Sequence, residues 1–320
     1  MRASGRRSFG RIKVTRYVIR RLIATVPTLL AVTVLVFLMV QLVPGDPAEI
    51  FLGEKRSTPE LLAQVRHDMG LDRPLYVQYF SYLWNLLHGD LGVSLFNEQP
   101  VLKQILDAFP YTLELAVSAM LISTVLGVSL GIVSALKHNS WVDSLSMALA
   151  LVGVSMPVFW LGLLLILVFS VRLKWFPPMG QGGLSRLVLP ALALGLLSSA
   201  TLARLVRSSM LDVLSEDYIR TARAKGLRER VVIIRHALRN ALIPAVTVIG
   251  LQFGGLLSGA VLTETIFARV GLGRMYVESI LNKDITMVQG LTLMLALFIM
   301  LINILVDISY AMLDPRIRYE

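Results

Sequence analysis

The most regular feature of the sequence is a series of six long apolar stretches separated by polar segments. Each stretch runs for at least 17 residues without Asp, Glu, Lys or Arg: 22–45, 115–136, 144–171, 187–203, 240–263 and 285–306. An α-helix rises about 1.5 Å per residue and the hydrocarbon core of a bilayer is about 30 Å thick, so about 20 apolar residues cross it. The pattern therefore predicts six transmembrane segments.

These segments are predicted to be helices. A backbone in lipid must satisfy its own hydrogen bonds, which leaves only helices or the strands of a closed barrel. None of the six stretches alternates apolar and polar residues with the period of two that a barrel wall requires. The predicted fold class is an all-α integral membrane protein with six transmembrane helices, in keeping with a mean hydropathy of +0.70.

Basic residues are distributed unequally between the two sides that the six spans define. The set made of 1–21, 137–143, 204–239 and 307–320 holds 20 Lys and Arg in 78 positions, whereas the other connections hold 11 in 105. Because segments rich in Lys and Arg stay in the cytoplasm, both termini are expected there. The formal net charge of +10 then faces anionic lipid headgroups, and no nucleic-acid partner is needed to explain it.

The polar segments differ in length, which sets the expected organisation of the chain. The expected order is a basic cytoplasmic segment, the first transmembrane helix, an external region, a five-span core with the cytoplasmic loop 204–239, and a cytoplasmic tail: 1–21, 22–45, 46–114, 115–306 and 307–320. In the external region, Ser57 or Thr58 can cap a short helix. The aromatic stretch 74–89 is predicted to be an interfacial amphipathic helix rather than a seventh span.

The third span contains a proline that predicts a break in the helix. Pro157 removes one backbone donor beside the small residue Ser155, so we expect a kink that serves either packing or a pore-lining hinge. Ser155, Pro157, Gln252 and Ser258 are candidates for lining a translocation path. The alternative for such polar side chains is ordinary hydrogen bonding within the bundle.

Glycines in two spans predict close helix packing. The second span carries Gly127 and Gly131, and the fifth carries Gly255 and Gly259 among others. Small residues four apart on a membrane helix let another backbone approach closely. We therefore expect both spans to pack tightly, either within the bundle or against a second subunit.

The sequence lacks the motifs of common catalytic sites. It contains no cysteine, no G-x-x-x-x-G-K-[ST] phosphate loop, no H-E-x-x-H metal motif and no G-x-S-x-G nucleophile motif. Glu114, Glu264 and Asp307 lie only at the edges of spans, whereas ion-coupled carriers usually hold acids well inside them. The chain is expected to be no enzyme and to hold no cofactor or metal, and ion coupling is disfavoured.

The cytoplasmic loop 204–239 contains a short helix that is specified at both ends. Ser215 is positioned to cap its N-terminus, Asp217 places negative charge in its first turn, and Gly226 can take the left-handed conformation that ends it. A helix over 216–225 is shorter than the roughly 12–15 residues that an isolated helix needs in water. Its Ala and Thr surface favours docking on a soluble cytoplasmic protein over lying on anionic headgroups, which its arginines would suit.

Several motifs resemble those of binding-protein-dependent ABC importer permeases. RTARAKG at 220–226 lies where that family has its cytoplasmic Glu-Ala-Ala…Gly loop, although Arg220 and Thr221 replace the Glu-Ala of the general consensus. HALRNALIPAVTVIGLQ at 236–252 is similar to the dipeptide and oligopeptide branch. The same branch is matched by VPGDP at 43–47, HGDLGVS at 88–94, WFPPMG at 175–180 and LDPRIR at 313–318. The resemblance covers essentially the whole chain.

The resemblance implies a permease subunit with the architecture of a type I ABC importer, located in the inner (plasma) membrane of a bacterial or archaeal cell. Such a chain pairs with a second homologous permease, often as a heterodimer, and receives solute from an extracytoplasmic binding protein. Two cytoplasmic ATPase subunits hold ATP and Mg. The implied coupling helix contains Asp217, Tyr218, Thr221, Ala222, Ala224, Gly226 and Leu227. Implied substrates are di- or oligopeptides, with nickel, glutathione or an oligosaccharide as alternatives.

Two other classes of function remain open at this point. A self-contained secondary carrier or channel would use the loop 204–239 only to bind lipid, and it would move solute without partner proteins. A membrane scaffold would have no transport path at all. Solute flux through liposomes that contain this chain alone would distinguish the carrier from the permease.

Overall fold

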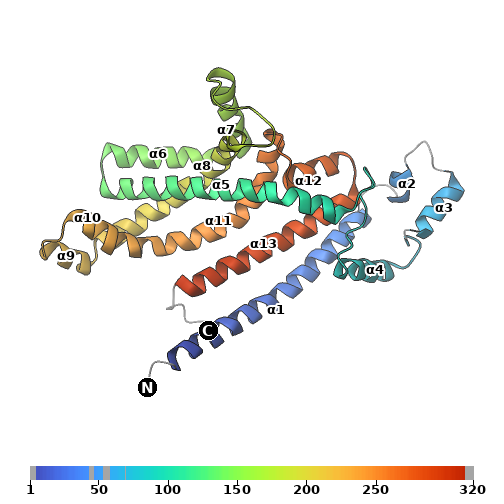
Figure 1. Ribbon diagram of the computed structural model, residues 1–320, viewed down its shortest axis with the longest axis horizontal. Coiled ribbons are helices and arrows are strands. Elements are labelled where there is room, and N and C mark those ends of the chain that lie inside the picture. The colour runs from blue at the N-terminus through green and yellow to red at the C-terminus, as the bar shows by residue number, and fades with distance from the viewer. Residues whose placement is uncertain (1–4, 43–46, 53–57, 69, 314–320) are drawn as a thin grey trace. The chain divides into compact units, whose positions relative to one another are not determined.

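The computed structural model describes residues 5–42, 47–52, 58–68 and 70–313, which form helices joined by turns and short loops (Figure 1). The long helices are α1 (Gly5–Leu42), α5 (Val101–Leu136), α8 (Leu184–Leu214), α11 (Leu238–Ile266) and α13 (Ile285–Leu313). The shorter ones are α2 (Pro47–Leu52), α3 (Pro59–Asp68), α4 (Leu75–Leu87), α6 (Trp141–Ser155), α7 (Val158–Leu165), α9 (Asp217–Ala224), α10 (Glu229–Val231) and α12 (Leu272–Leu281). The π-helical segments η1 (Ile166–Arg172) and η2 (Val232–Ala237) continue α7 and α10. The predicted all-α fold is confirmed.

Within the described residues, five of the predicted spans are long apolar helices. They are Ile23–Leu42, Val101–Leu136, Leu184–Leu214, Glu229–Ile266 and Ile285–Val306. The helix that contains the second span begins at Val101, before the predicted residue 115, because Asp107 and Glu114 interrupt the apolar run without ending the helix. The first part of helix α5 therefore lies within the predicted external region 46–114.

The third predicted span, 144–171, is not a single kinked helix. α6 and the segment formed by α7 and η1 meet at an angle of 109°. Met156 has an extended backbone (φ −82°, ψ 132°), because Pro157 crowds the residue before it and lacks the N–H that would continue α6. The expected kink is therefore a corner, and the two arms together supply the sixth apolar segment.

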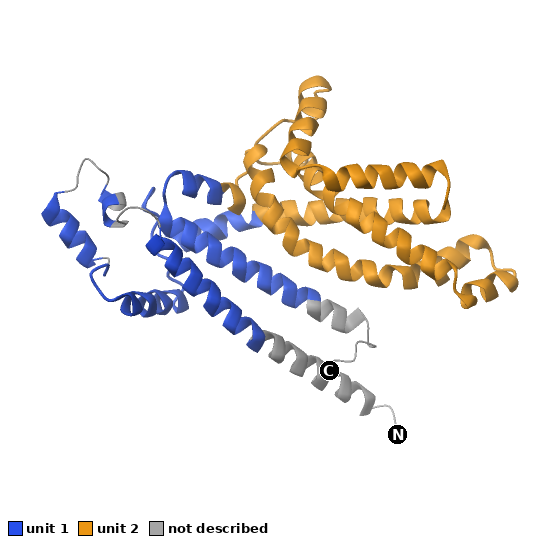
Figure 2. Cartoon of the chain, turned by 180° about the vertical axis from the view of Figure 1, so that it is seen from behind, with its two compact units in different colours: residues 1–110, 275–320 blue, residues 111–274 orange. Residues whose placement is uncertain are grey.

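The chain divides into two compact units, shown in separate colours in Figure 2. Unit 1 comprises residues 1–110 and 275–320, and there α1 packs along α13 while α4 lies against α1. Unit 2 comprises residues 111–274, and there α8 packs against α6, α7 and α11. In α8, 61% of the residues in its most apolar stretch are buried, compared with 17–28% in the other four long apolar helices. α8 is therefore the central helix of unit 2.

Contact between α5 and α8 depends on glycine. A Cβ atom on Gly127 would lie 2.8 Å from the carbonyl oxygen of Ser199, and one on Gly131 would lie 2.7 Å from that of Ala203. A side chain at either position would force the two helices apart. The predicted close packing of the second span is confirmed. In the fifth span, a Cβ atom on Gly259 would lie 2.9 Å from Cδ1 of Leu194 on α8, so close packing is confirmed there, whereas one on Gly255 would meet no described atom within 4 Å.

The external region contains, after α2, the short helix α3 that its sequence predicts. The N–H of Leu61 donates to Oγ1 of Thr58 at 3.3 Å, so Thr58 caps α3. The other candidate cap, Ser57, lies outside the described residues. α4 then forms within the stretch 74–89, as expected.

A buried aspartate fastens the loop after α4 to the last span. Asp284 caps α13 by accepting the N–H of Met287 at 3.1 Å. The same carboxylate accepts the hydroxyl of Ser94 and the N–H of Leu95, the latter at 3.2 Å. Ser94 and Asp284 are both buried, so the turn region after α4 has a fixed place in unit 1.

Candidate functional site

The cytoplasmic loop contains the short helix α9, which follows directly after α8. The hydroxyl of Ser215 donates to the carbonyl oxygen of Asp212 at 2.7 Å, in the last turn of α8. Ser215 therefore ends α8, and its predicted role as the N-cap of the next helix is wrong. Glu216, with an extended backbone (φ −68°, ψ 146°), takes that position without a side-chain hydrogen bond. The reason is that α8 continues beyond its apolar run to Leu214.

The C-terminal end of α9 follows the sequence pattern. Gly226 has a φ of +75°, in the left-handed region, and its N–H donates to the carbonyl oxygen of Arg223 at 2.9 Å. Most side chains are strained at this φ, so glycine is the residue that ends the helix here with the least strain. The prediction that Gly226 ends this helix in a left-handed conformation is confirmed.

One face of α9 is buried against neighbouring helices of unit 2, to which α9 itself belongs. Ile219 is fully buried and Ala222 is 7% exposed. Both belong to an apolar cluster that includes Val206 and Met210 of α8 and Val232 of η2. Eight residues are too few for a stable isolated helix, so this contact keeps α9 folded. Ile219 is absent from the predicted site, although it is the only large aliphatic residue of α9.

Polar contacts hold α9 on either side of its buried face. Nδ2 of Asn240, in the first turn of α11, donates to the hydroxyl of Tyr218 at 2.8 Å. Arg223 donates from Nη2 and Nε to the two carboxylate oxygens of Glu229, at 2.8 and 3.2 Å. These hydrogen bonds raise the pKa of the Arg223 guanidinium above its ordinary value, because they favour its charged form. The start of α9 is therefore held by α11, through Tyr218, and its end by α10, through Arg223.

The opposite face of α9 points away from the bundle. At about 100° per residue, Asp217, Thr221 and Ala224 lie opposite Ile219 and Ala222, and all three are exposed. We call these three residues the outward face of α9. Of the predicted coupling residues, Ala222 packs into its own bundle, while Asp217, Tyr218, Thr221, Ala224, Gly226 and Leu227 are exposed.

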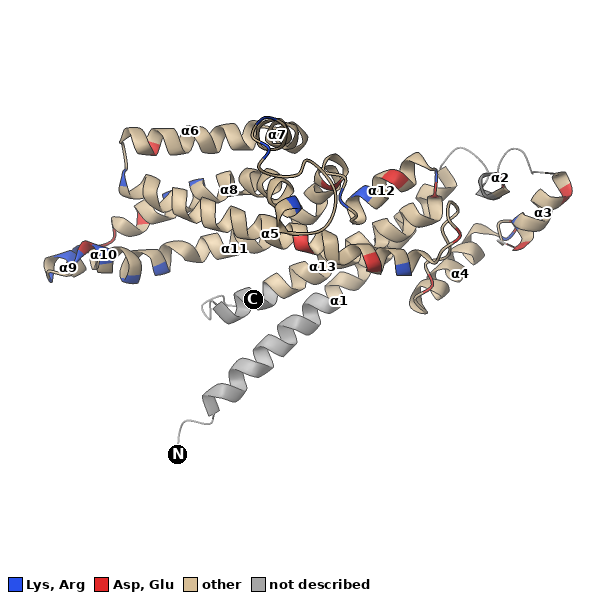
Figure 3. Ribbon diagram, turned by 45° about the horizontal axis from the view of Figure 1, so that its top comes forward, with Lys and Arg blue, Asp and Glu red and all other residues tan. Residues whose placement is uncertain are grey.

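Basic side chains surround the outward face. The side chains of Arg220, Arg223, Lys225, Arg228 and Arg230 are all exposed. Figure 3 shows several Lys and Arg positions along α9 and α10. Nη1 of Arg220 lies 3.4 Å from Oδ1 of Asp217, and both side chains are largely exposed, so this ion pair contributes little stability. The small outward face, which itself carries the acid Asp217, is thus flanked by both basic side chains and the exposed acids Glu216 and Glu229.

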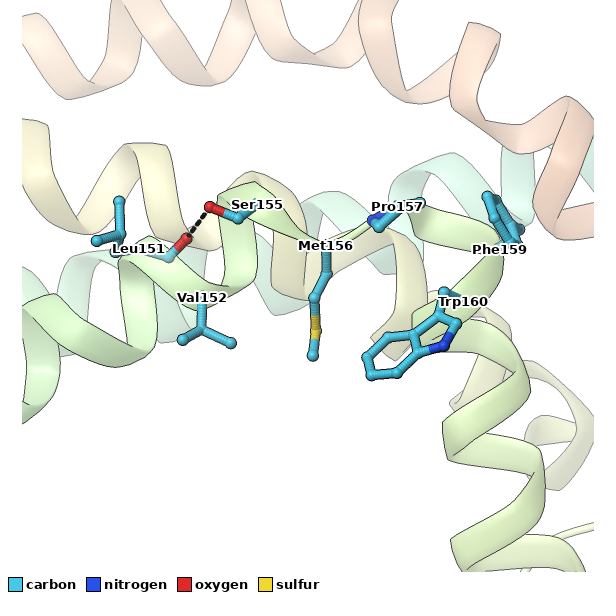
Figure 4. Close-up of a pocket in the computed structure, with 7 residues that line it drawn as sticks. All are labelled: Leu151, Val152, Ser155, Met156, Pro157, Phe159 and Trp160. Atoms are coloured by element: carbon cyan, nitrogen blue, oxygen red, sulfur yellow. Dashed lines mark hydrogen bonds between the residues drawn. The ribbon is translucent and has the colours of Figure 1, made fainter.

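The candidate path residues do not gather at one place. Ser155 and Pro157 line an open groove of about 580 Å³ at the corner between α6 and α7 (Figure 4). The groove is otherwise apolar and is lined by Leu151, Val152, Met156, Phe159 and Trp160. Gln252 instead donates from Nε2 to the carbonyl oxygen of Ser198 on α8 at 3.2 Å, and Ser258 is exposed on α11. That these four candidate residues line a translocation path stays a prediction.

Comparisons with known proteins decide the family. Residues 127–319 match the family described as "Binding-protein-dependent transport system inner membrane component", and residues 14–116 match its N-terminal region. The chain is 46% identical over 304 residues to the glutathione transport system permease protein GsiC of Escherichia coli O6:H1, covering 95% of this chain and 99% of GsiC. The chain belongs to this permease family.

Two further similarities agree with this assignment. The permease is 42% identical over 336 aligned positions to the dipeptide transport system permease protein DppB of Escherichia coli K12, covering 95% of this chain and 99% of DppB. The inward-facing MetNI methionine ABC transporter matches with a TM-score of 0.58 at 17% identity, covering 66% of this chain and 96% of that one. That match shows the fold alone. The predicted family, importer-type fold and inner-membrane location are confirmed, and ATP hydrolysis resides in separate subunits.

The permease also has a buried charged cluster that sequence pattern alone did not identify. Asp143, in the first turn of α6, is 4% exposed and accepts hydrogen bonds from the hydroxyl of Ser134 and the N–H of Asn139. Arg207 of α8 donates to both of its carboxylate oxygens. In the sequence, Asp143 only marks the border of an apolar run and Arg207 is one basic residue among many. Their pairing across 64 positions leaves no local signal.

An acidic residue near the end of the fifth span has a structural role in this permease. Glu264, near the end of α11, is fully buried. Its Oε2 accepts the N–H of Gly273 at 2.8 Å and that of Arg274 at 3.3 Å, which caps the start of α12. The carboxylate therefore supplies the hydrogen-bond acceptor that the first N–H groups of α12 lack within their own helix.

Proposed function

We propose that this permease and a second homologous permease chain, as a heterodimer, form the translocation path of an ATP-driven importer for small peptides. GsiC is named for glutathione, itself a tripeptide, and DppB is named for dipeptides. The chain aligns with 99% of the length of both relatives, so it has room for the same path. An extracytoplasmic binding protein delivers the peptide, and this chain holds no ATP or Mg of its own.

The division of α9 into two faces is the observation that carries the proposed coupling role. Ile219 and Ala222 bind α9 to the permease, whereas Asp217, Thr221 and Ala224 turn their small side chains outward. A surface without bulky side chains lets another protein backbone approach closely. We propose that the outward face docks on a cytoplasmic ATPase subunit and that Tyr218, Gly226 and Leu227 border the contact. Contact at this surface lets a movement of the ATPase shift α9, and the packing of Ile219 against α8 passes that shift on to α8.

A substitution at Ala224 tests the docking surface. Ala224→Trp leaves the buried face intact but fills the outward face, so we expect it to reduce peptide uptake and peptide-stimulated ATP hydrolysis by the whole transporter at least tenfold. Ala224→Ser keeps the small surface and should retain both activities. Membrane level and thermal stability of both variants should match the parent. Unchanged ATP-driven uptake with Ala224→Trp would contradict the coupling role.

The substrate class needs its own experiment. The whole transporter, reconstituted in liposomes with its binding protein, should import labelled di- and tripeptides when ATP is supplied to the ATPase side. Nickel and an oligosaccharide serve as the competing substrates. ATP-driven uptake of one of these without peptide uptake would contradict the peptide assignment while leaving the permease assignment intact. ATP-independent flux through the permease chain alone would instead support a self-contained carrier.

A further inference from the structure

Helix α4 in unit 1 has three faces of different chemistry. At about 100° per residue, Tyr79, Tyr82 and Leu86 share a face that is partly buried. The next face around the helix is apolar and open: Tyr76 is 67% exposed, Phe80 64%, Trp84 64% and Leu87 75%. The remaining face is polar and exposed, and it carries Ser81, Asn85 and His88. We call the second of these the aromatic face of α4.

The partly buried face places α4 beside the first membrane span. The ring of Tyr79 meets that of Phe37 edge to face at 5.4 Å, and the ring of Tyr82 lies 6.0 Å from Phe37. The hydroxyl groups of Tyr79 and Thr33 are hydrogen-bonded at 3.0 Å. These contacts hold α4 against α1 by several side chains rather than by one.

The same contacts set the depth of α4. Thr33 lies nine residues before Leu42, the last described residue at the external end of the apolar span Ile23–Leu42. At about 1.5 Å per residue this is about 14 Å along α1, close to half of a hydrocarbon core about 30 Å thick. Phe37 lies about 8 Å from the same end. The packed residues of α4 therefore reach into the outer half of the span, on the side that the basic-residue bias assigns to the exterior.

A helix at this depth with an open apolar face meets lipid. We propose that α4 lies in the outer leaflet as an interfacial helix, with Tyr76, Phe80, Trp84 and Leu87 among phospholipid chains and Ser81, Asn85 and His88 toward the headgroups and water. Tyr and Trp are the side chains that favour this region of a bilayer, because each combines an apolar ring with a polar group. α4 contains no Asp, Glu, Lys or Arg that would have to be desolvated.

Depth also decides against a soluble partner as the occupant of the aromatic face. A water-soluble binding protein stays outside the bilayer, whereas α4, the helix that carries the aromatic face, packs through Tyr79 and Tyr82 beside Phe37, about 8 Å inside the span. Lipid contact gives α4 a second anchor besides α1, and it fixes the height of the loop that Asp284 holds at Ser94. The proposal is independent of which substrate the permease carries.

Single cysteines test this placement, because the chain contains no cysteine. Phe80→Cys and the matched control Ser81→Cys are neighbours in sequence but lie on the aromatic and the polar face. The full permease chain, labelled with a nitroxide and reconstituted in phosphatidylethanolamine and phosphatidylglycerol vesicles, is probed with oxygen and with a water-soluble nickel chelate. We expect the ratio of oxygen to nickel collision to be several-fold higher at Phe80→Cys. Trp84→Cys provides a second position on the aromatic face.

Three results would overturn the proposal. Equal, high nickel accessibility at Phe80→Cys and Ser81→Cys would place α4 in water. Protection of the aromatic-face labels from both reagents would mean that protein covers them. In cells that express the whole transporter, a benzophenone amino acid at Phe80 should form adducts of phospholipid mass, and a cross-link to another protein there would identify a protein occupant instead.

Discussion

Arg207 holds Asp143 through two parallel hydrogen bonds, of 2.7 Å from Nε to Oδ1 and 2.8 Å from Nη2 to Oδ2. Arg207 lies between Val206 and Met210 on α8, and these two apolar residues belong to the cluster that anchors α9. One short stretch of α8 therefore contacts α9 and the first turn of α6. We expect a movement of α9 to reach α6 through this stretch, since α6 leads directly to the corner at Pro157.

Breaking this ion pair should destabilise unit 2 and impair transport. Asp143→Asn leaves Arg207 without its charge partner, and loss of one partner of a buried pair costs about 3–5 kcal/mol, with less expected here because Arg207 is 24% exposed. We expect a lower midpoint of thermal unfolding in detergent and lower uptake. The exchange Asp143→Arg with Arg207→Asp should recover part of both losses. Asp212→Asn, an exposed site on α8, is the control. If Asp143→Asn unfolds at the same temperature as the parent and Asp212→Asn, the ion pair does not stabilise unit 2.

Shortening Ile219 should release α9 without unfolding the bundle. Ile219→Ala removes most of the apolar contact that holds an eight-residue helix, and such core truncations cost about 2–5 kcal/mol. We expect much faster hydrogen exchange of the amides of residues 217–227 and unchanged exchange in α5. Thr221→Ala, on the exposed outward face, should leave exchange near the parent level. Slow exchange in both variants would show that the polar contacts of Tyr218 suffice to fix α9.

The same substitution at two glycines should have opposite effects. Gly131→Ala puts a methyl group 2.7 Å from the carbonyl oxygen of Ala203, and overpacking of this kind costs about 1–3 kcal/mol. Gly255→Ala meets no atom within 4 Å and should stabilise α11 by up to about 1 kcal/mol through helix propensity. Thermal unfolding of the two purified variants in one detergent gives the comparison. A stable Gly255→Ala variant that fails to assemble with the second permease would place a close subunit contact at Gly255.

Removing the cap of α13 should loosen the loop after α4. Asp284→Ala deletes an N-cap worth about 0.5–2 kcal/mol and also leaves the hydroxyl of Ser94 without its acceptor. We expect faster proteolysis within residues 92–97 and a modest loss of thermal stability. Asp284→Asn retains a capping oxygen and should lose less. Asp107→Ala, on an exposed face of α5, serves as the control. Identical cleavage of the three proteins would mean that Asp284 does not hold the loop.

Local pattern predicted the parts of the structure that depend on neighbours in sequence. Runs of apolar residues located the spans, Thr58 marked the start of α3, and Gly226 marked the end of α9, because each signal acts within a few residues of backbone. The break at Pro157 was also predicted, since proline always removes a donor. Its angle was not, because the direction of α7 depends on its contacts with α8 and α11 rather than on the proline.

An all-helical membrane protein without catalytic motifs can be read from the amino-acid order alone, because hydropathy and helix ends are local properties. The folded chain was needed to show that Ala222 turns inward, that Ile219 anchors α9, and that Ser215 belongs to α8. It also brought Arg207 to Asp143 and Tyr79 to Thr33. These relationships depend on which face of a helix meets another helix far away in sequence. Packing against distant residues decides that choice, and composition along the chain does not record it.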